Sequence, residues 1–206
     1  MNRIENDMTR YLIVGSGAAG YAAAGTIRRH DPSGEIVIFS AEEDGYYSRP
    51  ALAYYLSREI NKKTLFPLNR TDLEKQNIIL EHKLIADLNP EDKIVIDSKQ
   101  NKFAYDRLLL ATGAAAVTPE IEGRSLDGVV YLDSLAQTVQ MIRQSKRGKK
   151  ALVVGGGITA LEIVEGLLAR RMEVHFLLRG NHYWNRVLDQ QESDPVSYTH
   201  LRAHET

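Results

Sequence analysis

Three closely spaced glycines near the amino end form the first segment of the sequence that indicates a ligand site. The segment reads Gly15-Ser16-Gly17-Ala18-Ala19-Gly20. An apolar run precedes it and alanine-rich helix formers follow, so we expect a strand, a tight turn and a helix. In that context Gly15 allows the turn, Gly17 lets the backbone approach a diphosphate, and Gly20 lets the helix pack closely on the strand. Because the N–H groups that open a helix attract anions, the segment predicts a dinucleotide site.

A carboxylate for the ribose of such a ligand is expected about 20 residues farther on, at the end of the next strand. Residues 36–39 form a β-branched and aromatic run that is typical of that strand, and Glu42 follows it closely. We therefore predict that Glu42 binds an adenosine ribose. The alternative is a glycine-rich turn with solvated acids behind it.

The same succession recurs later in the chain. An apolar run at 151–154 leads into Gly155-Gly156-Gly157-Ile158-Thr159-Ala160, and helix formers and a second apolar run follow. Ala160 stands at the third glycine position, a substitution that the pattern tolerates. We predict a second nucleotide site at Gly155, Gly157 and Ala160, the alternative being glycines that only shape a turn.

The strand after the second loop ends near Leu178, which cannot bind a ribose diol, and Arg179 follows at once. An arginine at this place could pair with a 2′-phosphate, with Arg186 as a second partner, which favours NADPH over NADH. The alternative, a solvated Arg179 with the adenosine held by backbone groups, stays open.

Four segments in this order resemble a known family. They are Gly15–Gly20, Tyr47–Pro50, Tyr105–Gly113 and Gly155–Ile158. Together they are similar to the FAD-dependent pyridine nucleotide-disulfide oxidoreductases, particularly to the rubredoxin reductases, the ferredoxin reductases and the flavin part of assimilatory nitrite reductases. The resemblance covers about residues 9–190. It implies an α/β fold with two Rossmann-like domains, each a doubly wound parallel sheet, the second of them incomplete.

The resemblance also implies FAD at the first loop and NAD(P)H at the second. The residues implied for FAD are Gly15, Ser16, Gly17, Ala18, Ala19, Gly20, Glu42, Arg49, Thr112 and Gly113. For Arg49 the alternative is an ordinary surface arginine. Several relatives carry a lysine five residues after this arginine, and Tyr54 replaces it here, which departs from the family pattern at the flavin ring.

The reaction implied by the resemblance is hydride transfer from NAD(P)H to FAD, followed by electron transfer to an external acceptor. Rubredoxin, ferredoxin, a quinone or a nitrite-reducing centre would serve, and no side chain is needed as a catalytic acid or base. The resemblance allows a homodimer at full length. The alternative function is a nucleotide-binding fragment without turnover, and a third is a flavin-free NAD-binding protein.

We expect an FAD-binding domain at 9–118, with an antiparallel meander at about 83–105, and the first part of an NAD(P)-binding domain at 119–190. Beyond Asp189 the pattern stops, and residues 195–206 resemble translated sequencing-adapter read-through, so 191–206 are set apart from the two domains. We therefore expect a truncated chain with a non-native or disordered tail.

The composition excludes several classes of protein. With 26 basic and 27 acidic residues and no basic stripe, nucleic acid is not an expected partner. The absence of cysteine excludes disulfides, thiolate metal sites and a redox dithiol within the chain, and the six histidines are too scattered to predict a metal site. No apolar run could span a bilayer or serve as a signal peptide, which makes the cytoplasm the expected compartment.

Overall fold

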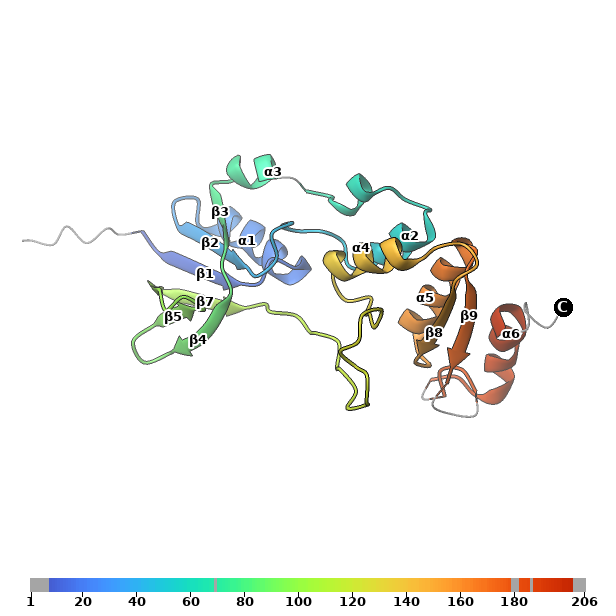
Figure 1. The fold of residues 1–206 in the computed structure, drawn as a ribbon. Helices are drawn as coiled ribbons and strands as arrows, with labels where there is room; N and C mark the ends of the chain where they lie inside the picture. The colour runs from blue at the N-terminus through green and yellow to red at the C-terminus, as the bar shows by residue number, and fades with distance from the viewer. Residues whose placement is uncertain (1–7, 69, 179–181, 186, 202–206) are drawn as a thin grey trace, which may run out of the picture. The chain divides into compact units, whose positions relative to one another are not determined.

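The computed structural model describes residues 8–68, 70–178, 182–185 and 187–201. Its ribbon is coloured along the chain in Figure 1. The chain divides into two compact units, one of residues 1–48 and 66–114 and one of residues 49–65 and 115–206. The segment 49–65, which lies inside the range expected for the first domain, thus belongs to the second compact unit.

A parallel sheet forms the centre of the first unit. Its strands lie in the order β3 (Ile78–His82), β2 (Glu35–Ser40), β1 (Arg10–Val14) and β7 (Arg107–Leu110). Helix α1 (Ala18–His30) joins β1 to β2, and the short helix α3 (Arg70–Glu74) precedes β3. These elements confirm the expected strand, turn, helix and strand at the start of the chain and the α/β class of the fold.

Both faces of this sheet are covered by apolar side chains. Ile13, Ile36 and Ile38 pack toward Ala24 of α1. The alternate strand residues, such as Leu12 and Phe39, pack on the other side because side chains in a strand alternate between faces.

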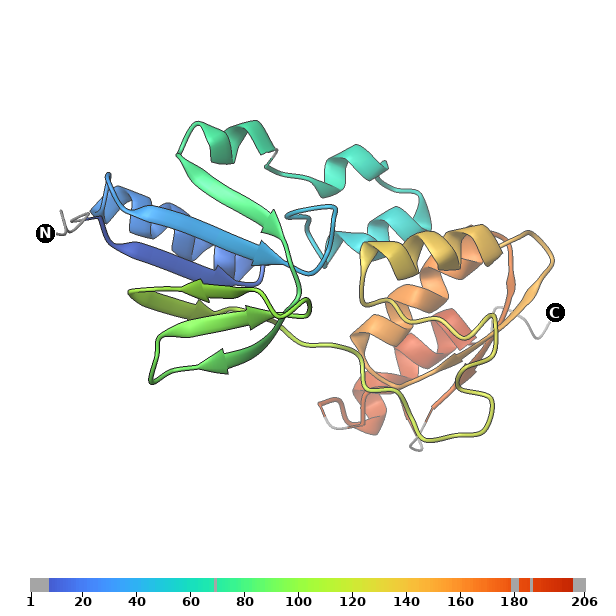
Figure 2. The same ribbon diagram turned by 60° about the vertical axis from the view of Figure 1, so that its left-hand side comes forward.

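An antiparallel sheet supplies the cover on that second side, within the range expected for the meander. It consists of β4 (Ile85–Asn89), β5 (Ile94–Asp97) and β6 (Lys102–Ala104), drawn in green beside the blue strands in Figure 2. Val95 is fully buried against the main sheet, and the rings of Phe39 and Phe103 lie 5.0 Å apart.

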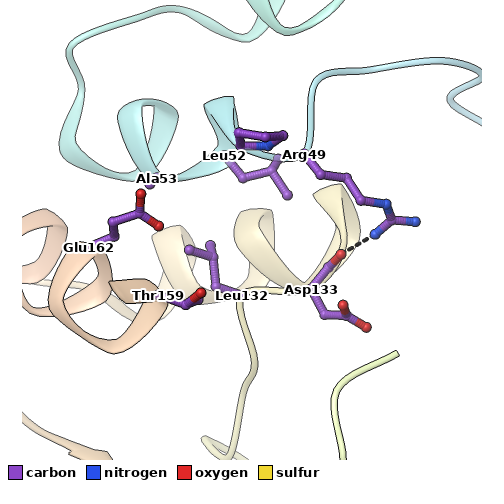
Figure 3. Close-up of a pocket in the computed structure, with 8 residues that line it drawn as sticks. Arg49, Leu52, Ala53, Leu132, Asp133, Thr159 and Glu162 are labelled. Carbon is purple, nitrogen blue, oxygen red and sulfur yellow. Dashed lines mark hydrogen bonds between the residues drawn. The ribbon is translucent and has the colours of Figure 1, made fainter. Parts of the chain in front are cut away.

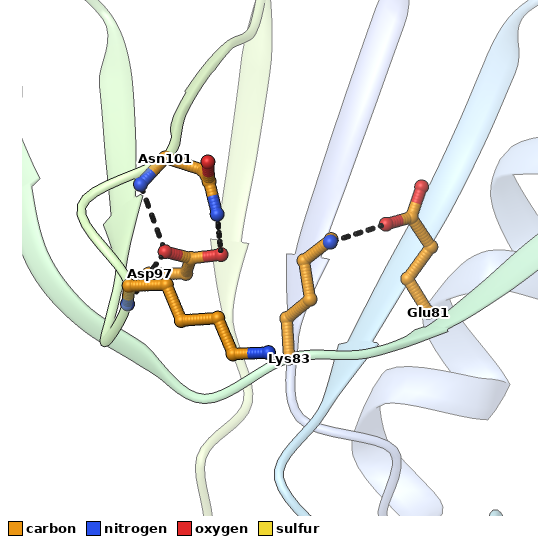
Figure 4. A network of polar contacts seen from close by, with 5 residues as sticks. Glu81, Lys83, Asp97 and Asn101 are labelled. Carbon is orange, nitrogen blue, oxygen red and sulfur yellow. Dashed lines mark hydrogen bonds and ion pairs between the residues drawn. The ribbon is translucent and has the colours of Figure 1, made fainter.

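The turn after β5 is organised by a buried carboxylate, shown in Figure 4. Asp97 is 3% exposed and accepts hydrogen bonds from the backbone N–H of Lys99 (2.8 Å) and from the backbone N–H and side-chain amide of Asn101 (both 2.9 Å). These donors, the Asn101 amide first, lower the pKa of Asp97. Nearby, Lys83 Nζ lies 3.4 Å from a carboxylate oxygen of Glu81.

The second unit contains a two-stranded parallel sheet with helices beside it. The strands are β8 (Lys150–Val154) and β9 (Glu173–Leu177), and the helical elements are α2 (Ala51–Ser57), the 3₁₀-helix η1 (Lys62–Leu65), α4 (Leu135–Gln144), α5 (Ile158–Ala169) and α6 (Gln190–Leu201). One core cluster joins α2, α4, β8 and α5 through Leu56, Met141, Val153 and Val164.

The docking of α2 on α5 explains why residues 49–65 belong to this unit. Leu56 is fully buried, and a β-carbon added at Gly166 would lie 2.7 Å from Leu56 Cγ. Arg170 Nε donates to the backbone O of Leu56 at 2.6 Å and so satisfies a carbonyl at the end of α2. The glycine therefore makes room for the leucine, and the arginine holds the helix end.

Helix α6 lies mostly within residues 191–206, the part for which a non-native or disordered tail is expected. Asp189 and Glu192 cap its start reciprocally, because Glu192 N–H donates to Asp189 Oδ1 (2.9 Å) and Asp189 N–H donates to Glu192 Oε2 (3.0 Å). Ser193 is buried and donates to the backbone O of Tyr183 at 2.8 Å. Residues 202–206 lie outside the described residues. Among the described helices, none combines the length and the apolar character needed to cross a bilayer.

Candidate functional site: two glycine loops

The first loop begins at Gly15, directly after β1. Its φ of +115° lies in the region that favours glycine, and its N–H donates to the backbone O of Phe39 at 2.9 Å. A β-carbon here would lie 2.1 Å from the carbonyl O of Ala111. Only glycine fits at this position because two strand ends close on its backbone.

The other two glycines of the loop have opposite surroundings. At Gly20 a β-carbon would lie 2.0 Å from the carbonyl O of Gly15, so helix and strand are in direct backbone contact. At Gly17, which precedes the first helical residue of α1, a β-carbon would meet no atom within 4 Å. No side chain caps this helix start, and Ala18 and Ala19 are exposed. The turn therefore offers bare backbone and a helix N-terminus to a ligand.

The strand order reverses next to this loop. The chain runs from β1 outward to β2 and β3 and then returns to β7 on the other side of β1, which is where open α/β sheets bind ligands. Thr112 and Gly113 follow β7 and are exposed, and Thr112 N would lie 3.1 Å from a β-carbon at Gly15. The structure thus brings these two predicted residues to the loop.

Glu42 follows β2 at the same edge of the sheet. Its carboxylate Oε2 accepts a hydrogen bond from the hydroxyl of Tyr47 at 2.5 Å. Ser16 of the loop is linked to the end of β2, since its Oγ lies 2.7 Å from Ser40 Oγ. Ser40 Oγ in turn bonds to the backbone of Glu42, so the predicted diphosphate loop is linked through two serine side chains to the backbone of the predicted ribose residue.

The second loop repeats this geometry. Gly155 has a φ of +150°, its N–H donates to the backbone O of Leu177 at 3.1 Å, and a β-carbon there would lie 3.1 Å from Ala160 Cβ. Gly157 precedes α5, and a β-carbon there would meet no atom within 4 Å. Ala160 takes the place of Gly20 in this loop, and its methyl group is the nearest atom to a β-carbon built at Gly155.

No carboxylate stands at the carboxyl end of β9 or at Leu178, the residue that follows it. The N–H of Gly15 donates to the backbone O of Phe39, and the N–H of Gly155 donates to that of Leu177. The residues that follow these two acceptors therefore correspond, and Leu178 takes the position of Ser40. Arg179 and Arg186 lie outside the described residues. The backbone N–H of Trp184 donates to the carbonyl O of Gly156 at 2.8 Å, a contact at the loop that sequence reasoning missed.

Arg49 lines a pocket of about 220 Å³ in the second unit, shown in Figure 3. Its Nη1 donates to the backbone O of Asp133. The pocket is lined by Arg49, Pro50, Leu52, Ala53, Leu132, Asp133, Thr159 and Glu162. The predicted contact of Arg49 with a flavin or a phosphate stays a prediction.

Glu162 is a charged residue of this pocket that was not predicted as a site residue from the sequence. Burial raises the pKa of its carboxyl, and the neighbouring Glu165 adds to the effect. The signal in the sequence is that these two acids stand in an otherwise apolar helix, ITALEIVEGLLA. Elsewhere in the described residues, no group of three or more histidine and acidic side chains is arranged to hold a metal ion.

The family model of the pyridine nucleotide-disulphide oxidoreductases matches residues 9–203. This chain belongs to that family. An NADH oxidase of Methanocaldococcus jannaschii is 32% identical over 196 residues, which are 91% of this chain and 44% of the relative. A rubredoxin-NAD(+) reductase of Ectopseudomonas oleovorans is 33% identical over 168 residues, 79% of this chain and 43% of the relative.

Solved structures show the same fold as this family member. The covalent putidaredoxin reductase–putidaredoxin complex contains a chain that superposes with a TM-score of 0.88 at 25% identity, over 94% of this chain and 48% of that one. This pyridine nucleotide-disulphide oxidoreductase sequence therefore spans a little under half the length of the relatives that it matches.

Proposed function

We propose that this chain binds FAD at its first glycine loop and NAD(P)H at its second, as the nucleotide-binding part of an FAD-dependent oxidoreductase. One observation carries the proposal: Gly17 and Gly157 present backbone to open space, while Gly15 and Gly155, two residues earlier, are closely packed. A diphosphate needs this arrangement, since it must approach the N–H groups of a helix start without meeting a side chain.

The proposed FAD-binding domain comprises residues 9–118. Residues 15–19 would form the diphosphate loop, with the backbone N–H groups after Gly15 as donors, because the Gly15 N–H already donates to Phe39. Glu42 would hold the adenosine ribose, with Thr112 and Gly113 beside it. The contact proposed for Arg49 is with the flavin or a phosphate. Residues 119–190 would be the first part of the NAD(P)-binding domain, with Gly155, Gly157 and Ala160 at its loop.

With both groups bound, the nicotinamide would supply a hydride and the flavin a carrier that passes the electrons on. The residues of this chain would bind and orient both groups, without a catalytic acid or base. Because the 206 residues include no cysteine, they supply no redox dithiol, and electrons would leave for an external acceptor. The names of the rubredoxin-NAD(+) reductase and of a p-cumate dioxygenase ferredoxin–NAD(+) reductase component support a small redox protein in this role.

For the nicotinamide cofactor we propose NADPH. The support is the lack of a carboxylate at the end of β9 and the arginine that follows it in the sequence. The rates at which NADPH and NADH reduce the bound flavin test this proposal. If NADPH reduces the flavin of Arg179→Ala as fast as that of the wild-type protein, the arginine does not support NADPH.

A second candidate is a nucleotide-binding chain without turnover. The matched segment corresponds to 44% of the NADH oxidase and 43% of the rubredoxin-NAD(+) reductase, so turnover by these 206 residues is a separate question from nucleotide binding.

Spectroscopy of the purified chain separates the two candidates. Bound flavin absorbance that bleaches on anaerobic addition of NADPH would support the oxidoreductase. Bound flavin that stays oxidised would favour binding without turnover, and folded protein that takes up no FAD would contradict both.

A further inference from the structure

Ser40, the last residue of β2, lies at the centre of a chain of hydrogen bonds behind the first loop. It is 2% exposed, and its Oγ donates to the carbonyl O of Glu42 at 2.7 Å. The same oxygen accepts from the N–H of Glu42 at 3.2 Å and lies 2.7 Å from Ser16 Oγ.

The donors and acceptors of these groups determine the direction of the bond between the two serines. A hydroxyl has one proton and two lone pairs. Ser40 uses its proton for the carbonyl of Glu42, so Ser16 must donate to Ser40. The Ser16 hydroxyl then has no proton left for a diphosphate, which offers only acceptors. Ser16 therefore cannot contribute to diphosphate binding as a side-chain donor.

Glu42 is held from two further directions. His82 of β3 places Nδ1 2.9 Å from the same carbonyl O, and because a carbonyl only accepts, Nδ1 carries the proton. The hydroxyl of the buried Tyr47 donates to the carboxylate. Both the backbone and the carboxylate of Glu42 are thus fixed by neighbours from β2, β3 and the loop after β2.

We propose that Ser16 and Ser40 are positioning residues for the ribose carboxylate: the pair couples the diphosphate loop to Glu42 and sets Glu42 for the adenosine ribose. The inference rests on the proposed function, because it assumes an adenosine diphosphate group at this loop. Loss of the Ser16 hydroxyl should therefore weaken binding of the ribose and leave binding of the diphosphate unchanged.

Two probes that differ only at the ribose test this assignment. ADP carries the ribose diol, and 2′,3′-dideoxy-ADP lacks it. We expect Ser40→Ala to bind ADP about tenfold more weakly, as for loss of a buried hydrogen bond, and Ser16→Ala to bind it a few-fold more weakly. The double variant should be no weaker than Ser40→Ala, because both changes break one chain of bonds. All variants should bind dideoxy-ADP as the wild-type chain does.

Ser98→Ala, a change at an exposed serine of the same unit, is the matched control and should leave both affinities unchanged. Ser40→Thr keeps the hydroxyl and should restore ADP binding, and if Ser40→Ala does not fold, Ser16→Ala and Ser40→Thr carry the test.

Equal losses for both probes, additive losses in the double variant, or no loss for ADP would overturn the inference. Failure of the wild-type chain to bind either probe would instead contradict the proposed nucleotide site itself.

Discussion

Gly17 and Gly157 occupy the same position in the two loops, and neither is required by packing, because a β-carbon at either would meet no atom within 4 Å. Gly15 and Gly20, in contrast, are fixed by backbone atoms about 2 Å from where a β-carbon would lie. Packing therefore explains Gly15 and Gly20, whereas for Gly17 and Gly157 we propose a role in ligand binding.

Exchanging these glycines for alanine should separate the two roles. Gly20→Ala should lower the free energy of unfolding by about 1–3 kcal/mol, because backbone must move to admit the methyl group. Gly17→Ala should change stability by less than about 0.5 kcal/mol but weaken FAD binding at least about tenfold, because the methyl group enters the space proposed for the diphosphate. Thermal unfolding and an FAD titration measure both, and a Gly17→Ala chain that binds FAD normally would contradict the account.

At the scale of elements, the docking of α2 on α5 depends on residues that are far apart in the sequence. Leu56 meets Gly166 and Arg170, more than 100 residues later. This contact draws residues 49–65 into the second compact unit.

Enlarging Gly166 should therefore release α2. Gly166→Ala should cost about 1–3 kcal/mol, because its methyl group would overlap the fully buried Leu56. The double variant with Leu56→Ala should lose less free energy of unfolding than the two single variants lose together, because the smaller side chain leaves room for the methyl group. Chemical denaturation of the four proteins measures this as a double-mutant cycle. Additive losses would show that the two positions are not in contact.

The meander should be sensitive to acid through Asp97. Its pKa in the folded protein lies below the value near 3.9 of an unfolded chain. The ionised carboxylate thus stabilises the fold above about pH 4, and this contribution is lost as the pH falls through the folded pKa. Between about pH 5 and pH 3 the melting temperature of Asp97→Asn should fall less than that of the wild-type chain, and parallel curves would argue against this role.

Local patterns predicted the parts of the fold that depend on neighbours in the sequence. The strand, glycine loop and helix at residues 10–30 follow from apolar runs and glycine spacing, and so does the repeat at 150–177. The docking of α2 could not be predicted, because the room that Gly166 leaves for Leu56 exists only in the folded chain. The capping pair of Asp189 and Glu192 was readable in the sequence and was missed.

For the whole molecule, one family includes relatives with differently named activities, among them an NADH oxidase and a rubredoxin-NAD(+) reductase. Fold alone does not select an acceptor. What this chain contributes is a pair of similar loops in two compact units, and the central claim is that each loop binds its own dinucleotide.

Calorimetric titration of the flavin-free chain with FAD and then with NADPH tests that claim most directly, using Gly17→Val and Gly157→Val as a matched pair. We expect Gly17→Val to lose only the FAD site and Gly157→Val only the NADPH site, and the wild-type chain to bind one equivalent of each ligand. Loss of both ligands from either folded variant, or of neither, would contradict it.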